Sequence, residues 1–281
     1  MATADILSKI KGRNIKIIGL GGIGATLVSY LARFLWSRNA RTSNVMLYLA
    51  DGDKYEFKNS ERMAFSTGEM NKAVVKAMEM ADAFTDKLLV IPIPFYVDPQ
   101  NIKDIICDKD IVLLAVDNHR TRKLVSDHCG KLRDILLISG GNDGVENGYS
   151  GAEGNIQIYE RRGGKNLKNP ITLFHPEIQD PHDEAPSNKV NHCDQLANGS
   201  APQVLFTNLA VASAMLNAFY SWLHDCLDYE EAYLDILTGK VHPSYRELFR
   251  NKVSKNKTAF FKQSIFLGDG FRRCFPLFKN L

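Results

Sequence analysis

Apolar residues in the first half of the chain gather in short unbroken runs, and stretches of helical length lie between them. The runs are rich in β-branched residues, which is typical of strands buried on both faces of a sheet. The runs lie at 14–20, 45–50, 88–97, 110–116 and 135–139, and the helical stretches lie at 23–36, 72–87 and 118–132. This alternation predicts a parallel sheet with helices on both faces.

The pattern changes after Gly140. Six glycines lie between Gly140 and Gly154, and residues 155–160 then alternate apolar and polar side chains, as an antiparallel strand does. The segment 163–202, which we call the crossing loop, is polar, rich in Pro, Asn, Asp and His, and has little periodicity. A loop of this length is uncommon unless it is functional or flexible.

An apolar helix from Gln203 and a strand at 233–237 follow the crossing loop. The elements together predict an α/β fold: a Rossmann-like, doubly wound, mostly parallel sheet with an antiparallel extension. One domain over residues 1–238 with a tail over 239–281 explains the pattern more simply than two domains do.

The helix that begins at Gln203 is long enough to cross a bilayer. However, Ser213, Asn217 and Ser221 lie four positions apart and form a polar stripe, which is typical of a helix in a soluble core. The N-terminus is polar and has no apolar signal core. We therefore expect a cytoplasmic protein that makes no membrane contact.

Composition narrows the function classes. With 44% hydrophobic and 24% charged residues, the chain has an ordinary globular composition, which excludes intrinsic disorder. Its net charge of +3 is too weak to argue for a nucleic-acid partner. None of the five cysteines lies in a C-x-x-C pair, so we expect no zinc.

The charge is not evenly spread. From Val241 onward the chain carries nine Lys and Arg residues against two acidic residues, together with eight aromatic residues. This basic, aromatic-rich tail is too apolar for a solvated extension. Docking on a partner protein, packing on the core and stacking on nucleic acid are all open; we predict docking.

The first strand runs directly into a glycine cluster. Gly19, Gly21, Gly22 and Gly24 contain the spacing G-x-G-x-x-G between a strand and a helix. Glycines at these places allow a tight turn and let backbone N–H groups approach the phosphates of a nucleotide at the helix N-terminus. The alternative is a glycine turn that binds nothing.

Asp51 ends the second strand, where an acidic residue in this geometry accepts hydrogen bonds from ribose hydroxyls. The alternative is a turn residue before Gly52, because Asp-Gly is a common turn pair. These features alone indicate either a dinucleotide-dependent dehydrogenase or an ATP-binding enzyme.

Further polar residues follow the ends of the strands. They are Asp53, Asn59, Arg62 and Lys72 after the second strand, and Asp117 and Asn118 after the strand at 110–116. Because parallel strands end at one crevice, Asp51 and Asp117 can face the same cavity. Nucleotidyl transfer needs cations around the α-phosphate and a carboxylate for Mg²⁺, whereas hydride transfer needs neither.

In order and spacing, these residues resemble the family of ThiF, MoeB and ubiquitin-activating-enzyme (E1-like) adenylyltransferases over roughly residues 14–237. The resemblance rests on Gly19-x-Gly21-Gly22-x-Gly24, Asp51-x-Asp53, Asn59-x-x-Arg62, Gly68 with Lys72, Asp117-Asn118-x-Arg120, and the glycine-rich stretch 151–157. The compact length, the missing zinc cysteines and the tail resemble bacterial operon-encoded ThiF proteins.

The resemblance implies a role for each residue of these motifs. The glycines, Asp53 and Asn118 belong to the nucleotide site, and Asp51 would hold the ribose. Asn59, Arg62 and Lys72 would contact the triphosphate, and Asp117 would bind Mg²⁺ with ATP. The substrate would be the C-terminal carboxylate of a ubiquitin-like β-grasp protein, which attacks the α-phosphate to form an acyl-adenylate.

The resemblance also implies a homodimer, and it leaves open whether the activated acyl group passes to an E2-like protein, to a sulfur-transfer acceptor or to another acceptor. Cys193 lies in the crossing loop, where family members carry the thiol that receives the acyl group, so we expect a thioester there. A buried packing cysteine is the alternative, although the flanking residues His192 and Asp194 are polar.

Structural alternatives and departures remain. Arg62 and Lys72 can be solvated surface charges, Lys76 can take the place of Lys72, and Asp117 can cap the next helix. The Arg-bearing N-terminal helix of several family members is absent from the residues before Asn14, and the spacing from Arg62 to Lys72 is short.

Three functions are therefore compared: an E1-like adenylyltransferase, a NAD-dependent oxidoreductase, and a non-catalytic nucleotide-binding scaffold of the same fold. Asp117 with Arg62 favours the adenylyltransferase over the oxidoreductase. Cys193 and the complete set of phosphate-binding residues favour it over the scaffold.

Overall fold

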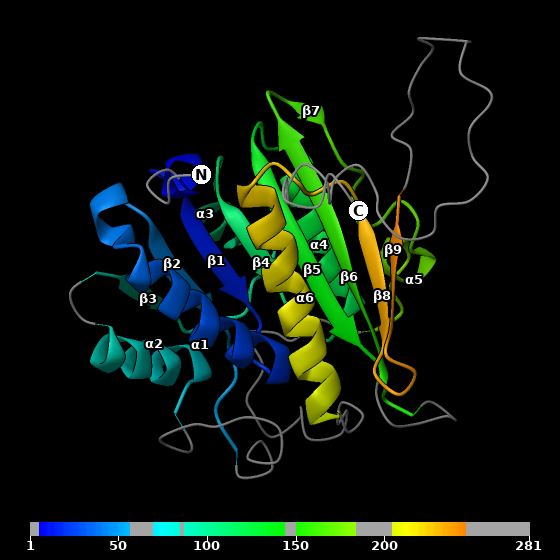
Figure 1. Ribbon diagram of the computed structural model, residues 1–281, viewed down its shortest axis with the longest axis horizontal. Coiled ribbons are helices and arrows are strands. Elements are labelled where there is room, and N and C mark those ends of the chain that lie inside the picture. The colour runs from blue at the N-terminus through cyan, green and yellow to red at the C-terminus, as the bar shows by residue number, and fades with distance from the viewer. Residues whose placement is uncertain (1–5, 57–69, 85–86, 144–149, 184–203, 246–281) are drawn as a thin grey trace, which may run out of the picture.

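The computed structural model describes residues 6–56, 70–84, 87–143, 150–183 and 204–245, which fold into a sheet with helices on both faces (Figure 1). The parallel half contains β1 (Asn14–Ile18), α1 (Gly22–Ser37), β2 (Met46–Ala50), α2 (Lys72–Ala83), β3 (Leu89–Ile93), α3 (Ile102–Ile105), β4 (Ile111–Leu114), α4 (His119–Cys129) and β5 (Ile135–Asn142). The other half contains β6 (Glu153–Arg162), β7 (Lys165–Asn166), α5 (Pro176–Gln179), α6 (Leu205–Leu223), β8 (Glu231–Asp235) and β9 (Lys240–Ser244).

Among the described residues, nine strands form one sheet in the order β3-β2-β1-β4-β5-β6-β8-β9, with β7 beside β6. The pairs β1–β2, β2–β3, β1–β4 and β4–β5 are all parallel, as the unbroken apolar runs predicted. The strand order reverses between β1 and β4. In open α/β sheets, ligands bind beyond the carboxyl ends of the strands at such a reversal.

The antiparallel extension starts at β6, which pairs with β5 from Ile135↔Arg161 to Asn142↔Gly154. β8 pairs antiparallel with β6, and β9 pairs antiparallel with β8. The mostly parallel sheet with an antiparallel extension is thus confirmed. β9 lies within the segment that we assigned to the tail, so residues 240–244 belong to the sheet, while residues 246–281 lie outside the described residues.

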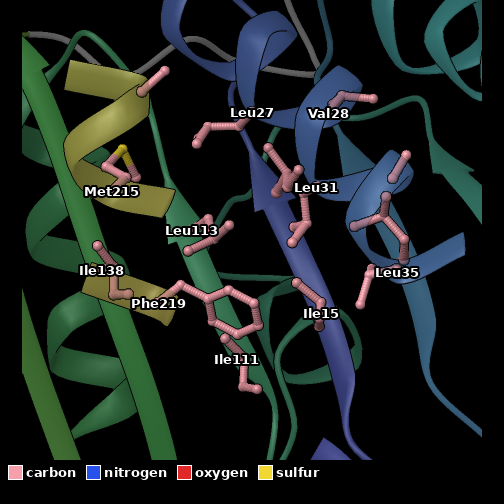
Figure 2. Close-up of a cluster of buried hydrophobic side chains, with 14 of the residues drawn as sticks. Ile15, Leu27, Val28, Leu31, Leu35, Ile111, Leu113, Ile138, Met215 and Phe219 are labelled. Carbon is pink, nitrogen blue, oxygen red and sulfur yellow. The ribbon is translucent and has the colours of Figure 1, made fainter. Parts of the chain in front are cut away.

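The strands of the parallel half are apolar throughout because helices cover both of their faces. On one face, Leu27 and Leu31 of α1 and Met215 and Phe219 of α6 surround Leu113 of β4 (Figure 2). This layer brings α1 and α6 side by side, although they lie far apart in the sequence (Figure 1).

The opposite face of β4 is buried by a second layer. Val112 and Leu114 pack there with Val125 of α4 and with Ile102 and Ile105 of α3. Because successive strand residues point to opposite faces, the four residues of β4 divide evenly between the two layers.

α6 is the apolar helix that the sequence predicted. Val211, Met215 and Phe219 are buried, whereas Ser213 and Asn217 are exposed, so the polar stripe lies on the outer side of the helix. No helix in the described ranges is long and apolar enough to span a membrane.

The described part of the crossing loop, up to residue 183, is attached to the sheet. Ile171 and Ile178 are buried in it, and His175 packs against β8. The imidazole of His175 lies between two carboxylates: Nε2 is 2.7 Å from Oε1 of Glu231, and Nδ1 is 2.8 Å from Oε1 of Glu177. Burial acts to lower the pKa of His175, but the two carboxylates outweigh burial and raise the pKa above its ordinary value of 6.5.

This contact predicts a pH-dependent stability. A raised pKa in the folded state means that His175 contributes stability fully below pH 6.5, and that this contribution is lost as the pH rises through the folded pKa. The difference in the free energy of unfolding between wild type and His175→Gln should therefore be largest at acidic pH and shrink toward alkaline pH. Urea unfolding between pH 5.5 and 9 measures this difference.

His242, which is exposed on β9, provides the matched control. His242→Gln should leave the pH dependence of the unfolding free energy as it is in wild type. A difference between wild type and His175→Gln that stays constant over this pH range would contradict the prediction.

Candidate functional site

The loop between β1 and α1 is packed so closely that a side chain would overlap a neighbour at three of its glycines. Gly19 has φ +86°, and a Cβ there would lie 2.8 Å from the carbonyl carbon of Ala115 beyond β4. A Cβ on Gly24 would overlap the carbonyl oxygen of Gly19, and one on Gly22 would overlap the side chain of Asn208. The glycine loop therefore packs tightly against the carboxyl end of β4 and against α6.

Gly21 differs from the other three glycines. Among the described residues, no atom lies within 4 Å of the position that its Cβ would take. Gly21 is also the N-cap of α1 and provides no side-chain hydrogen bond to the first turn of the helix. An uncapped helix N-terminus offers backbone N–H groups and a positive dipole to an anion, so this end of α1 suits a phosphate group.

Asp51 lies directly after β2 and is buried. Its Oδ2 accepts a hydrogen bond of 2.6 Å from the N–H of Leu20, and its Oδ1 accepts one of 2.8 Å from the N–H of Asp53. Burial raises the pKa of Asp51 to about 6, against the opposing effect of the Lys72 cation. The hydrogen bond from Asp53 makes Asp51 a turn residue, as the alternative interpretation expected, and the hydrogen bond from Leu20 holds the glycine loop in place. A contact between Asp51 and the ribose stays a prediction.

The ammonium group of Lys72 pairs with another predicted site residue, Asp53. Its Nζ lies 2.8 Å from Oδ2 of Asp53, and its side chain is buried whereas that of Asp53 is half exposed. Burial acts to lower the pKa of Lys72, but Asp51, Asp53 and Asp117 together raise it above its ordinary value. The structure therefore keeps a protonated lysine among three carboxylates, and this arrangement argues against the solvated-surface alternative for Lys72.

Local capping explains how Lys72 reaches this place. Asn71 caps α2 by accepting hydrogen bonds from the N–H groups of Ala73 and Val74, and its own amide donates to the carbonyl of Asp51 at 2.9 Å. The N–H of Lys72 also donates to the carbonyl of Asp53 at 2.8 Å. α2 therefore starts at the Asp51–Asp53 turn.

Lys76 lies one helical turn further on, and its Nζ is 2.7 Å from Oε2 of Glu79 on the same helix. Lys72 is therefore the lysine that the fold places at Asp53.

Tyr96 is a residue that the sequence analysis missed. Its hydroxyl donates to Oδ1 of Asp53, and its ring lies where a side chain on Gly52 would point. Burial raises the pKa of Tyr96, and the bond to Asp53 raises it further, so the hydroxyl keeps its proton. Tyr96 and Lys72 together fix both oxygens of Asp53. The aromatic pair Phe95 and Tyr96 after β3 was the only available signal in the sequence, and it does not indicate a partner.

Asp117 and Asn118 follow β4 and differ in their surroundings. Asn118 is buried and caps α4, because its Oδ1 accepts a hydrogen bond of 2.8 Å from the N–H of Thr121. Asp117 is exposed; burial lowers the pKa of Arg122, and the charge of Asp117 opposes this lowering and also helps to raise the pKa of Lys72. The capping role that we considered for Asp117 thus belongs to Asn118, and Asp117 lies near the cations of the site.

Arg122 is a second residue that the sequence analysis missed, since the motif drew attention to Arg120. Its guanidinium donates to the carbonyls of Val116 (2.8 Å) and Gly140 (3.0 Å) and to the hydroxyl of Ser139 (3.0 Å). Arg122 therefore holds together the carboxyl ends of β4 and β5.

The guanidinium of Arg122 is buried, and burial lowers its pKa to about 10, against the opposing effect of Asp117. Gly141 leaves the necessary space, because a Cβ there would overlap the guanidinium. Gly140 and Gly141 stand out in the sequence of β5, but the sequence does not show that Gly141 makes room for a side chain of α4.

Arg120 itself contacts the described end of the crossing loop. Its Nε donates to the carbonyl of Asp183 at 2.8 Å, and its N–H donates to the Asp183 carboxylate at 3.0 Å. The N–H of His119 donates to the same carboxylate. The crossing loop therefore passes the N-terminus of α4, one turn from Asp117.

The structure brings together most of the predicted site residues that it describes. Gly19 to Gly24, Asp51, Asp53, Lys72, Asp117 and Asn118 lie at the carboxyl ends of β1, β2 and β4. Asn59, Arg62 and Cys193 lie outside the described residues, so their roles stay predictions. Within the described ranges no group of three or more His, Cys, Asp or Glu side chains is placed to hold a metal ion, and a magnesium contact of Asp117 stays a prediction.

Comparison with known proteins points to one family. A family model described as the ThiF family matches residues 2–256. The chain is 28% identical over 158 residues to the maize adenylyltransferase and sulfurtransferase MOCS3-1, which covers 55% of this chain and 30% of the maize protein. It is 29% identical over 136 residues to the SAMP-activating enzyme E1 of Haloferax volcanii, which covers 47% of this chain and 46% of the archaeal protein. The chain thus matches less than half of the length of either relative.

Solved structures show the same fold. The crystal structure of E. coli MccB with ATP has a TM-score of 0.59 and 16% sequence identity, and the match covers 85% of this chain and 65% of MccB. The crystal structure of PaaA also has a TM-score of 0.59 and 16% identity, with 85% of this chain and 66% of PaaA covered. At this level of identity the comparison concerns the fold, and it confirms the α/β architecture predicted from the sequence.

The glycine loop generates a prediction about stability. Gly24→Ala places a methyl group against the carbonyl oxygen of Gly19 and should lower the free energy of unfolding by about 1–3 kcal/mol or more. Gly21→Ala meets no described atom and keeps an ordinary backbone conformation (φ −72°), so it should lower the unfolding free energy by at most about 1 kcal/mol, for the loss of a preferred N-cap residue. Urea unfolding of the two variants compares them; equal losses would show that the loop is not packed as described.

Proposed function

Because the chain belongs to the ThiF family, we propose that it is an E1-like adenylyltransferase that uses ATP and Mg²⁺ to activate the C-terminal carboxylate of a ubiquitin-like β-grasp protein. One observation carries this proposal. The buried Lys72 cation, paired with Asp53 and close to Asp117, lies at the carboxyl ends of the strands beside the glycine loop.

The residues present fit a nucleotide. The open N-terminus of α1 at Gly21 supplies backbone donors for phosphate oxygens. Lys72 and Arg122 supply positive charge from buried positions, where electrostatic interactions are stronger than in water. Asp117 is the exposed carboxylate of the group and is available to a hard cation such as Mg²⁺.

In the proposed reaction, a carboxylate oxygen of the substrate attacks the α-phosphorus of ATP, the bond to the β-phosphate breaks, and pyrophosphate leaves. Negative charge builds up on the α-phosphate and on the leaving group, and Lys72 with Arg62 would balance it. Asp117 would hold the Mg²⁺, which neutralises phosphate charge when it is bound. Asn59 would contact the triphosphate, and Asp51 would accept from the ribose.

The dehydrogenase alternative explains less of the site. A nicotinamide cofactor accounts for the glycine loop and Asp51, but hydride transfer has no use for a lysine held protonated among Asp51, Asp53 and Asp117. A non-catalytic scaffold likewise gives no reason to bury this lysine and Arg122 next to an open helix N-terminus. The names of the relatives in maize and Haloferax volcanii also support adenylation rather than hydride transfer.

The partners and the assembly are part of the proposal. A ubiquitin-like protein is supported by family membership, while an E2-like or sulfur-transfer acceptor and a cytoplasmic location stay predictions. For the homodimer, α1 and α6 carry exposed apolar or aromatic side chains, namely Tyr30, Leu205, Phe206, Leu209 and Tyr220. Burying these side chains in a second copy would remove them from water, since exposed apolar patches often mark interfaces.

The first functional prediction concerns Asp117. In an ATP–pyrophosphate exchange assay with the cognate ubiquitin-like protein, Asp117→Ala should lose about 100-fold or more of the rate. The reason is that the Mg²⁺ that neutralises phosphate charge would lose its carboxylate ligand. Its fold should persist, since Asp117 is exposed. Asp127→Ala provides the control, because it removes an exposed carboxylate that lies on α4 instead, and it should keep the wild-type rate. Wild-type exchange by the Asp117→Ala variant would show that the site is assigned wrongly.

The second functional prediction concerns Cys193. Incubation with ATP and the cognate ubiquitin-like protein should yield an adduct that thiols cleave, and Cys193→Ala should abolish this adduct without reducing adenylation. Cys107→Ala provides the control, because Cys107 is an exposed free thiol remote from the crossing loop in sequence. If the adduct survives in Cys193→Ala, the acceptor is another cysteine.

A further inference from the structure

Asn208 is a buried polar residue for which the site described so far has no use. It lies on the first turn of α6, and its side chain is fully buried. Neither Oδ1 nor Nδ2 has a hydrogen-bond partner among the residues that the structure describes. The preceding residue is well satisfied, because the hydroxyl of Thr207 donates to the carbonyl of Gly151 at 2.6 Å. This turn of α6 is therefore anchored, and the amide of Asn208 is held in place without a hydrogen-bond partner in the described part of the chain.

A buried amide with both polar atoms unpaired is costly, because it has lost its hydrogen bonds to water and gained none in the protein. Native structures keep few such groups, and one that persists calls for a specific explanation. Packing does not supply it, since leucine has nearly the same shape as asparagine and would fill the space without this cost.

The position of the amide indicates what its partner is. A Cβ on Gly22 would overlap Nδ2 of Asn208 and lie 2.8 Å from its Cγ, so the amide presses directly on the backbone of Gly22. Gly22 is the first residue of α1, next to the open N-cap Gly21. The unpaired amide thus lies at the same helix N-terminus that suits a phosphate group.

We propose that Asn208 is a ligand of the nucleotide, donating from Nδ2 to a phosphate oxygen at the N-terminus of α1. This inference rests on the proposed function, because it assumes that a nucleotide occupies the site. Phosphate accepts hydrogen bonds and donates none at neutral pH, so the NH₂ group is the part of the amide that pairs with it. α6 then contributes to the site, together with the strand ends and α2.

The proposal predicts opposite effects on stability and on binding. Asn208→Leu removes the unpaired amide and keeps the shape, so the ligand-free variant should be at least as stable as wild type toward urea. The same variant should bind ATP with Mg²⁺ about tenfold or more weakly in calorimetry, because a hydrogen bond to a charged group is lost. Asn217→Leu, an exposed substitution on the same helix, should leave ATP affinity unchanged.

Each outcome has one meaning. Equal ATP affinities of wild type and Asn208→Leu would overturn the role of Asn208 and leave the adenylyltransferase proposal intact. A wild-type protein that binds NAD but not ATP with Mg²⁺ would overturn both. If Asn208→Leu does not fold, the ATP affinity of Asn208→Ala is compared with that of wild type instead. Loss of stability with unchanged affinity in either variant would show that the amide serves the fold alone.

Discussion

The buried carboxylate of Asp51 is the contact on which the candidate site depends. It accepts hydrogen bonds from the backbone of Leu20, in the glycine loop after β1, and from the backbone of Asp53, in the turn after β2. The ends of two neighbouring strands are thereby joined through one side chain. Together with the pairing of β1 and β2, it fixes the N-terminus of α1 relative to the Asp53–Lys72 pair.

Burying charge is costly, and the buried charged groups at the strand ends show this cost in their pKa values. Burial raises the pKa of Asp51 and lowers that of Arg122, so both groups lie in surroundings that disfavour their charge. Lys72 is the exception, because three carboxylates raise its pKa despite burial. Buried groups with shifted pKa values and nearby charge partners are typical of functional sites. The site thus combines a firmly held lysine with an arginine that is hydrogen-bonded only to neutral oxygen atoms in the described part of the chain.

The end of β5 and the helix α6 contribute to the site as well as to the core. Gly140 and Gly141 at the end of β5 accommodate Met215 of α6 and the guanidinium of Arg122. α6, which packs against α1, β5 and β6, brings Asn208 to the glycine loop. The same packing that buries the apolar face of α6 therefore carries a polar side chain to the N-terminus of α1.

The sequence by itself determined the parallel strands, the helices between them, and the glycine loop, because apolar periodicity and glycine positions act over a few residues. It also indicated Asp51, Asp53, Lys72 and Asp117, since residues that follow parallel strands share one edge of the sheet. What only the tertiary structure decided are the pairings: Lys72 rather than Lys76 beside Asp53, Tyr96 on Asp53, Arg122 across β4 and β5, and Asn208 against Gly22. Each of these joins elements distant in the sequence, and no local pattern encodes which side chain fills a space that another element leaves open.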